Sequence, residues 1–175
     1  MADSKWAIYN NEGLNIEKIK QIKSIRESVI SYKDAKLVSE KEILEMPCNI
    51  LVPAALENQI TVLNAKNIKA SIILELANWP ITPEADEVLE KNKIEVIPDI
   101  LANSWWVMVS YFEQVQNNQN FYWDEAEIDE RLFKKITSSA KDVYDTSKHY
   151  NTSLRSAAYI IAMTRVIDAM EMRGM

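Results

Sequence analysis

Apolar runs alternate with amphipathic segments through the first hundred residues. Three short runs, near residues 49–54, 70–76 and 94–97, are apolar almost throughout and indicate buried strands. Amphipathic or capped segments separate them and favour helices. Because strands that are apolar on both faces need helices to cover them, the alternation predicts a parallel sheet. We therefore expect an α/β fold with helices on the faces of the sheet.

Three helices in this half have clear start signals. Isoleucines at helical spacing predict one amphipathic helix over 16–29. Ser39 and Glu42 have the spacing of a capping box, which predicts a short helix after Ser39. Thr82 followed by Pro83 is typical of a helix that begins with proline in its first turn.

The last third of the chain is helical by pattern. We expect helices near 104–117, 124–150 and 154–173. The final one is apolar on most sides, so we expect it to be largely buried. No composition shift marks a linker, and the sequence predicts a single domain over residues 1–175.

Charge and hydropathy narrow the classes of partner. Apolar residues make up 47% of the chain, which favours a packed globule, and the net charge is −6. An acidic chain has no general attraction to nucleic acid or to anionic membranes, so we expect neither as a partner. Since no secretory signal and no apolar run of about 18 residues occur, we expect a cytoplasmic protein without membrane spans.

Glycine, cysteine and histidine are scarce, which excludes several kinds of site. Gly13 and Gly174 are the only glycines, whereas ordinary usage would give roughly a dozen. The sequence therefore contains no glycine-rich phosphate-binding loop. One cysteine and one histidine exclude an internal disulfide and Cys-cluster or multi-histidine metal sites. Cys48 lies beside an apolar run, and we expect its thiol to be buried. His149 lies in a polar helix end, where a structural role is expected.

Long, specific motifs cover nearly the whole chain. They lie at residues 7–10, 53–60, 82–86, 98–103 and 109–113. Together they resemble the C-terminal, NAD(P)-binding domain of glutamate dehydrogenase. The resemblance implies a partial doubly wound, Rossmann-like sheet, because nothing here matches the family's first β-α-β unit with its glycine-rich phosphate turn. Nothing matches the amino-terminal domain with the catalytic lysine and aspartate either, so we expect no catalytic residue.

The resemblance also implies family roles for four residues. Asp3 falls near the acidic position that contacts the adenosine ribose. Asn78 and Asn103 match positions that contact the cofactor, and Ser110 matches one that contacts substrate. Without a phosphate turn, we expect NAD or NADP binding to be absent or very weak. These four residues would then match the family in residue type but would no longer bind the cofactor or substrate.

Bulky side chains stand where the family has small ones. Two loops hold most of them, and both follow predicted strands at their carboxyl ends, where ligands bind in doubly wound folds. The bulky residues, which we expect to line one apolar interface, are Trp6, Leu76, Trp79, Ile81, Trp105, Trp106 and Met108. Since the motif residues around them are intact, we interpret the pattern as engineering of a glutamate dehydrogenase domain.

Three functions compete for this pattern. In the first, the former cofactor cleft has become a tryptophan-rich surface that binds a protein partner or a second copy of the chain, as a homodimer. In the second, it is a designed pocket or catalytic site, for which Lys5 is the nearest lysine. In the third, the chain retains NAD-dependent oxidoreductase activity. A structural alternative also stays open, in which the tryptophans fill a core.

Overall fold

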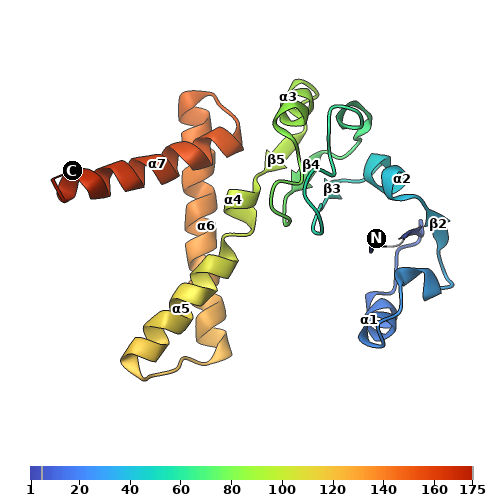
Figure 1. Cartoon of the computed structure of the whole chain (residues 1–175), viewed down its shortest axis with the longest axis horizontal. Coiled ribbons are helices and arrows are strands. Elements are labelled where there is room, and N and C mark those ends of the chain that lie inside the picture. The colour runs from blue at the N-terminus through green and yellow to red at the C-terminus, as the bar shows by residue number, and fades with distance from the viewer. Residues whose placement is uncertain (5, 175) are drawn as a thin grey trace.

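The structure is a computed structural model that describes residues 1–4 and 6–174 (Figure 1). Its parallel sheet consists of β3 (Ile50–Leu51), β4 (Ile72–Leu74) and β5 (Glu95–Ile97), in the order β3-β4-β5. Ile72 lies opposite Ile50 on one side and Glu95 on the other. The α/β fold with a parallel sheet, expected from the three apolar runs, is confirmed. Each strand is shorter than its apolar run, since β3 and β4 end two or three residues before their runs and β5 begins one residue after the start of its run.

Helices cover this sheet as the sequence signals indicate. A short α2 (Glu40–Glu45) starts at the Ser39 capping box, in which the Ser39 and Glu42 side chains satisfy each other's backbone N–H groups. A 3₁₀ turn, η2 (Ala65–Asn67), precedes β4. Helix α3 (Pro83–Lys91) starts at the Thr82 cap with proline in its first turn.

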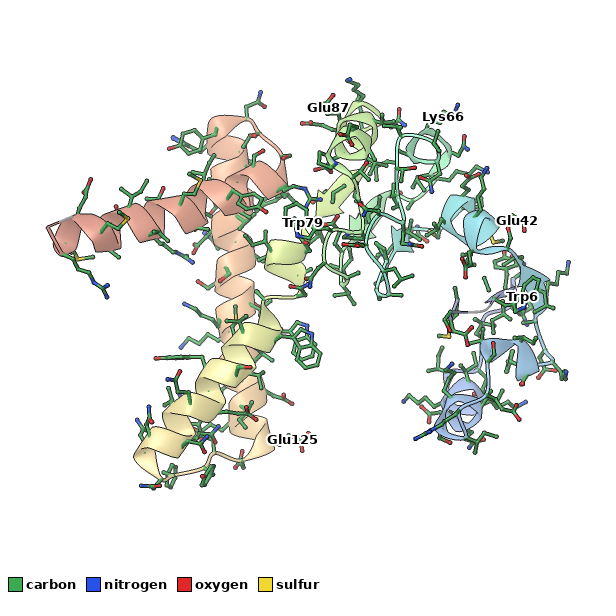
Figure 2. All side chains as sticks on the ribbon, in the orientation of Figure 1. Trp6, Glu42, Lys66, Trp79, Glu87 and Glu125 are labelled. Carbon is green, nitrogen blue, oxygen red and sulfur yellow. The ribbon has the colours of Figure 1, made fainter. Side chains whose placement is uncertain are left out.

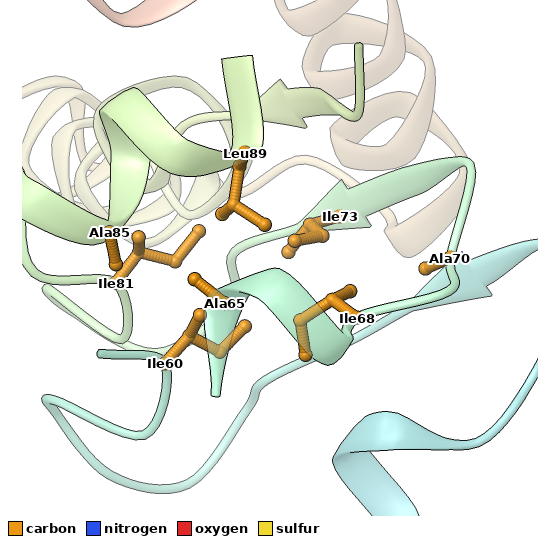
Figure 3. Packing of buried hydrophobic residues seen from close by; sticks show 8 residues of the cluster. All are labelled: Ile60, Ala65, Ile68, Ala70, Ile73, Ile81, Ala85 and Leu89. Atoms are coloured by element: carbon orange, nitrogen blue, oxygen red, sulfur yellow. The ribbon is translucent and has the colours of Figure 1, made fainter. Parts of the chain in front are cut away.

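The main core lies between the sheet, η2 and α3 (Figure 3). Ile73 from the middle strand points into it, as does Leu89 from α3, and neither side chain has any exposed surface. The other buried members are Ile60, Ala65, Ile68, Ala70, Ile81 and Ala85. Burial of these aliphatic side chains fixes how α3 sits on the sheet and where the β4–α3 loop begins.

The amino-terminal residues form a separate small unit. Strand β1 (Ala7–Tyr9) pairs antiparallel with β2 (Lys36–Val38), and Ile8 is buried against α1 (Ile16–Ser24) and η1 (Val29–Ser31). The helix predicted over 16–29 is therefore too long. It stops at Ser24 because the chain turns through a left-handed residue, Arg26, at φ 60°.

In the part of the chain described after β5, the structure has four helices. They are α4 (Asp99–Ala102), α5 (Trp105–Gln119), α6 (Glu125–Tyr150) and α7 (Leu154–Met172). The helix predictions for this third are confirmed in position. Leu101, Val143, Ala157 and Ala158 form a second buried cluster where α4, α6 and α7 meet.

The expectation that the last helix is largely buried is wrong. Only its first turns pack on α4 and α6, and its far half projects away from the rest of the chain (Figure 1). Five large apolar side chains of this half are exposed, namely Met163, Val166, Ile167, Met170 and Met172. Among the residues described, no helix is both long and apolar enough to cross a membrane.

Cys48 was expected to be buried, and this too is wrong. Its side chain is exposed in the loop between α2 and β3. Pro47 ends the regular structure there, so the apolar run that suggested burial begins only after the cysteine.

Candidate functional site at the carboxyl edge of the sheet

Two loops meet at the carboxyl edge of the parallel sheet. One follows β4 and the other follows β5 and the short helix α4. The side-chain amide of Asn103 donates a hydrogen bond to the Asn78 side-chain oxygen at 2.6 Å, which joins the two loops. The two family positions expected to contact cofactor are thus side by side.

Trp79 holds an unusual backbone conformation in the first loop. Its φ is 51°, in the left-handed region that suits glycine. Its N–H donates to the Asp99 carboxylate at 2.9 Å, and its carbonyl accepts from the Asn58 N–H at 2.9 Å. The tryptophan therefore occupies a backbone shape made for a smaller residue, and neighbouring groups hold it there.

The Trp79 side chain is 49% exposed. It lines a shallow depression of about 230 Å³ between α3 and the start of α7, together with Pro83, Asp86 and Arg155 (Figure 2 labels Trp79). The indole therefore covers part of the depression and leaves about half of its surface exposed.

Trp105 and Trp106 form a second aromatic group at the start of α5. Their rings stack with centroids 4.0 Å apart. Trp105 is half-buried, whereas Trp106 is 61% exposed. None of the ring contacts found among the described residues links this pair to Trp79. The tryptophans expected in one cluster therefore lie in two aromatic groups, Trp79 in the loop after β4 and the Trp105–Trp106 pair in the first turn of α5.

A buried ionic network lies directly beneath the first loop. Arg155 of α7 donates to Glu75 at 2.8 Å, to Asp86 at 2.6 Å and to Asp99 at 3.4 Å. Glu75 also accepts the Asp99 N–H at 2.8 Å. Because Asp99 in turn holds the Trp79 N–H, one guanidinium is connected to both loops of the site.

Burial and pairing shift the protonation equilibria of this network. Burial raises the pKa of the Glu75 carboxyl above its ordinary value, although hydrogen bonds from Arg155 and the Asp99 N–H oppose the shift. Burial also disfavours the charged guanidinium of Arg155. The hydrogen bonds to Glu75 and Asp86 outweigh that effect and hold the pKa of Arg155 above its usual range.

The structure separates two predicted interface residues from each other. Leu76 is exposed at the end of β4, beside the Asn78 loop. Ile81 is 3% exposed and belongs to the main core, so it is not available to a partner. Ile81 pairs across an isolated bridge with Ile60, and this turns its side chain inward.

Trp6 and Asp3 lie in the amino-terminal unit, apart from the two loops. Trp6 is 47% exposed, and Figure 2 shows it well away from Trp79. The Asp3 carboxylate accepts from the Val29 N–H at 2.9 Å and pairs with Lys23 at 2.9 Å. Asp3 thus has a local structural role. Lys5 lies outside the described residues.

Met108 and Ser110 lie on α5. Ser110 is exposed. Met108 lines a groove of about 860 Å³ between α5 and α6, where its neighbours include Tyr111, Phe112 and Lys134. Met108 therefore belongs to a different surface from Trp79. In the part of the chain that the structure describes, no group of three or more potential metal ligands occurs.

Sequence reasoning missed Glu75 and Arg155. The available signals were a glutamate inside an apolar strand run and an arginine at the start of an apolar helix. Either residue could have been a solvated charge, and only the fold brings together two positions that lie 80 residues apart.

Known proteins share both the sequence and the fold. The sequence profile of the Glutamate/Leucine/Phenylalanine/Valine dehydrogenase family matches residues 1–174. The chain belongs to this family. The chain is 44% identical over 174 residues to a glutamate dehydrogenase of Thermotoga maritima and 41% identical to an NAD-specific glutamate dehydrogenase of Staphylococcus aureus. The matched region includes 99% of this chain but only 42% of the length of each of these relatives.

Solved glutamate dehydrogenase structures support the family assignment. The structure from Peptoniphilus asaccharolyticus superimposes with a TM-score of 0.78 at 37% identity, over 95% of this chain and 37% of that one. Glutamate dehydrogenase 2 of Plasmodium falciparum gives 0.87 at 30% identity, over 98% of this chain and 41% of that one. The fold of this dehydrogenase-family chain is thus that of a part of the larger family members.

Proposed function

We propose that this chain is a non-catalytic member of the dehydrogenase family whose carboxyl-edge loops bind a second copy of the chain through exposed tryptophans. The observation that carries the proposal is Trp79. Its backbone is held in a glycine-like conformation by Asp99, and half of its indole is left in solvent beside the Asn78–Asn103 bond. Exposed aromatic side chains next to packed loops are typical of interface anchors.

The same geometry supports the absence of dinucleotide binding. The amides of Asn78 and Asn103 bond to each other, and the Asp3 carboxylate is engaged by Lys23 and by the Val29 N–H. Gly13 and Gly174, the only glycines, both have positive φ, but neither opens a helix that follows a strand of the parallel sheet. We therefore propose that the chain uses no NAD or NADP by itself.

The exposed area of the tryptophan side chains limits how strong the proposed dimer contact can be. Trp79 and Trp106, which are 49% and 61% exposed, together expose roughly 220 Å² of aromatic surface per copy, given about 200 Å² for each side chain. Two copies would bury about 440 Å², well below the roughly 1,200 Å² of stable interfaces. The proposal is therefore a weak dimer. Self-association has a precedent in the family, since a similar glutamate dehydrogenase from Thermus thermophilus is described as hetero-hexameric.

A second candidate is an NAD-dependent oxidoreductase role as part of a larger assembly. It is favoured by the 41% identity to a relative named NAD-specific glutamate dehydrogenase and by the retained residues Asn78, Asn103 and Ser110. In that case, residues that this chain does not contain would supply the catalytic groups.

Light scattering over a concentration series tests the proposal. The parent chain is expected to gain mass toward a dimer between about 10 and 500 µM, the range of a weak contact. The double variant Trp79→Gly plus Trp106→Gly is expected to stay monomeric. Trp123→Phe is the matched control, because Trp123 packs edge-on against Phe112 inside the helical part. A parent that stays monomeric throughout would contradict the proposal.

Two further expectations stay predictions. One is that the bulky residues were introduced by design, for which the intact motifs around Trp79 and Trp106 are the support. The other is a cytoplasmic location.

A further inference from the structure

In the buried network of the described residues, the Arg155 guanidinium pairs with three carboxylates that come from three different parts of the chain. Glu75 comes from the end of β4, Asp86 from α3 and Asp99 from the start of α4. The Glu75 side chain has no exposed surface, and the side chains of Arg155 and Asp99 are 16% and 8% exposed. A buried group of this kind is fixed in place, since each carboxylate would be costly to leave unpaired.

The contacts run in sequence from α7 to the first loop. Arg155 bonds to both Glu75 and Asp99, Glu75 accepts the Asp99 N–H, and Asp99 accepts the Trp79 N–H with its other oxygen. The Asp99 Oδ1 accepts from Arg155 and also, at 2.8 Å, from the Ile100 N–H, and the Oδ2 is the oxygen that accepts the Trp79 N–H. That acceptor and the Asn58 N–H, which donates to the Trp79 carbonyl, both hold the left-handed backbone of Trp79, a conformation that is unfavourable for a residue with a side chain.

We propose that Arg155 is a positioning residue through which the seating of α7 sets the conformation of the Trp79 loop. When α7 is seated, the guanidinium orients Asp99, and Asp99 holds the Trp79 N–H. When α7 shifts, Asp99 loses its cationic partner and the loop relaxes from the left-handed conformation. The inference rests on the proposed function only in that this loop carries the tryptophan of the binding surface.

The way α7 is packed would allow a contact on its far half to move Arg155. Its first turns pack on α4 and α6 through Leu101, Ala157 and Ala158. Beyond the ion pair of Arg165 with Asp142 of α6, the helix has exposed apolar side chains and projects away from the rest of the chain (Figure 1). Any contact that tilts the far half acts on the Arg155 end of the same rigid helix.

Amide exchange at Trp79, followed by NMR on the labelled full chain, tests the inference. Arg155→Met removes every donor but keeps most of the aliphatic stem. We expect the Trp79 N–H to exchange about tenfold faster in this variant, since its acceptor is no longer held. Arg155→Lys keeps the charge without the planar fork, so we expect an intermediate rate.

Arg165→Met is the matched control. Arg165 lies on the same helix and pairs with Asp142 of α6 at 3.5 Å, and none of the hydrogen bonds or ion pairs among the described residues joins it to either loop. We expect no change in Trp79 exchange relative to the parent. Equal Trp79 rates in Arg155→Met and Arg165→Met would overturn the inference.

A milder variant keeps the test decisive if Arg155→Met does not fold. Asp86→Ala removes only the outer carboxylate, whose side chain is 24% exposed. We expect faster Trp79 exchange there too, by a smaller factor, and no change at Trp79 would overturn the inference. Because exchange is measured on the monomer at low concentration, a failure of self-association contradicts the proposed function and leaves this result intact.

Discussion

Asn103 donates its side-chain amide hydrogen to the Asn78 oxygen at 2.6 Å, across 25 residues of sequence. This bond joins the loop after β4 to the loop after β5 and so defines the carboxyl edge as one surface. In a doubly wound sheet, this is the edge where ligands bind. In this chain the two asparagines bond to each other, and tryptophans flank them in both loops.

Replacing tryptophan by glycine is expected to cost less at position 79 than at position 106. At position 79, glycine relieves the left-handed backbone strain, which is worth about 1–2 kcal/mol. At position 106, glycine lowers the helix propensity of α5, because the unfolded chain gains backbone freedom, and it also removes the stacking on Trp105. Trp106→Gly should therefore lower the free energy of unfolding by at least about 1 kcal/mol more than Trp79→Gly. Urea denaturation of both variants measures this. Exposure alone favours the reverse order, since Trp106 is the more exposed residue.

NAD and NADH are expected to show no measurable heat of binding to the chain. The reasons are the missing phosphate turn and the mutual bond of Asn78 and Asn103. Isothermal titration calorimetry is the measurement, with a full-length glutamate dehydrogenase as the positive control. A micromolar dissociation constant would favour the oxidoreductase alternative.

Glu75 is expected to make the free energy of unfolding rise as the pH falls from neutral toward 4.5. Burial raises the pKa of Glu75 in the folded chain above the ordinary value of 4.5, so the folded state takes up the proton first. The stabilisation is complete below 4.5 and is lost as the pH rises through the raised value. Glu75→Gln should remove this part of the pH dependence, as urea denaturation at several pH values would show.

Glu87→Gln is the control for that experiment. Glu87 is exposed on α3, and among the described residues its ion pair is with Lys91, so its loss changes the net charge without touching the network. If the parent and Glu75→Gln keep a constant difference in free energy across the pH range, the assignment of this dependence to Glu75 is wrong.

Cys48 is expected to react with a thiol reagent in the folded state. Its side chain is exposed, but partial burial raises the pKa of the thiol above its ordinary value of 9.0. The rate of reaction with Ellman's reagent should therefore be slow at pH 7 and should increase as the pH rises past 9. Reaction only after addition of urea would show that the thiol is buried, and Cys48→Ser provides the blank.

Much of the secondary structure could be predicted from residues that are close together in the sequence. The apolar runs that became β3, β4 and β5, the Ser39 capping box and the Thr82-Pro83 start each depend on residues a few positions apart. Where the outcome depended on distant packing, prediction failed. The isoleucine stripe did not show that α1 would end at Ser24, and the apolar face of α7 did not show whether a partner would cover it.

For the candidate site, too, part was decided by the sequence and part by the fold. The sequence by itself determined the family, the scarcity of glycine and the presence of tryptophan at positions 79, 105 and 106. Only the tertiary structure decided that Ile81 faces the core, that Met108 faces a separate groove and that Arg155 reaches Glu75 from 80 residues away. The physical reason is that motifs and caps are made by neighbours in sequence, whereas burial and ion pairing depend on which distant segments the packed core brings together.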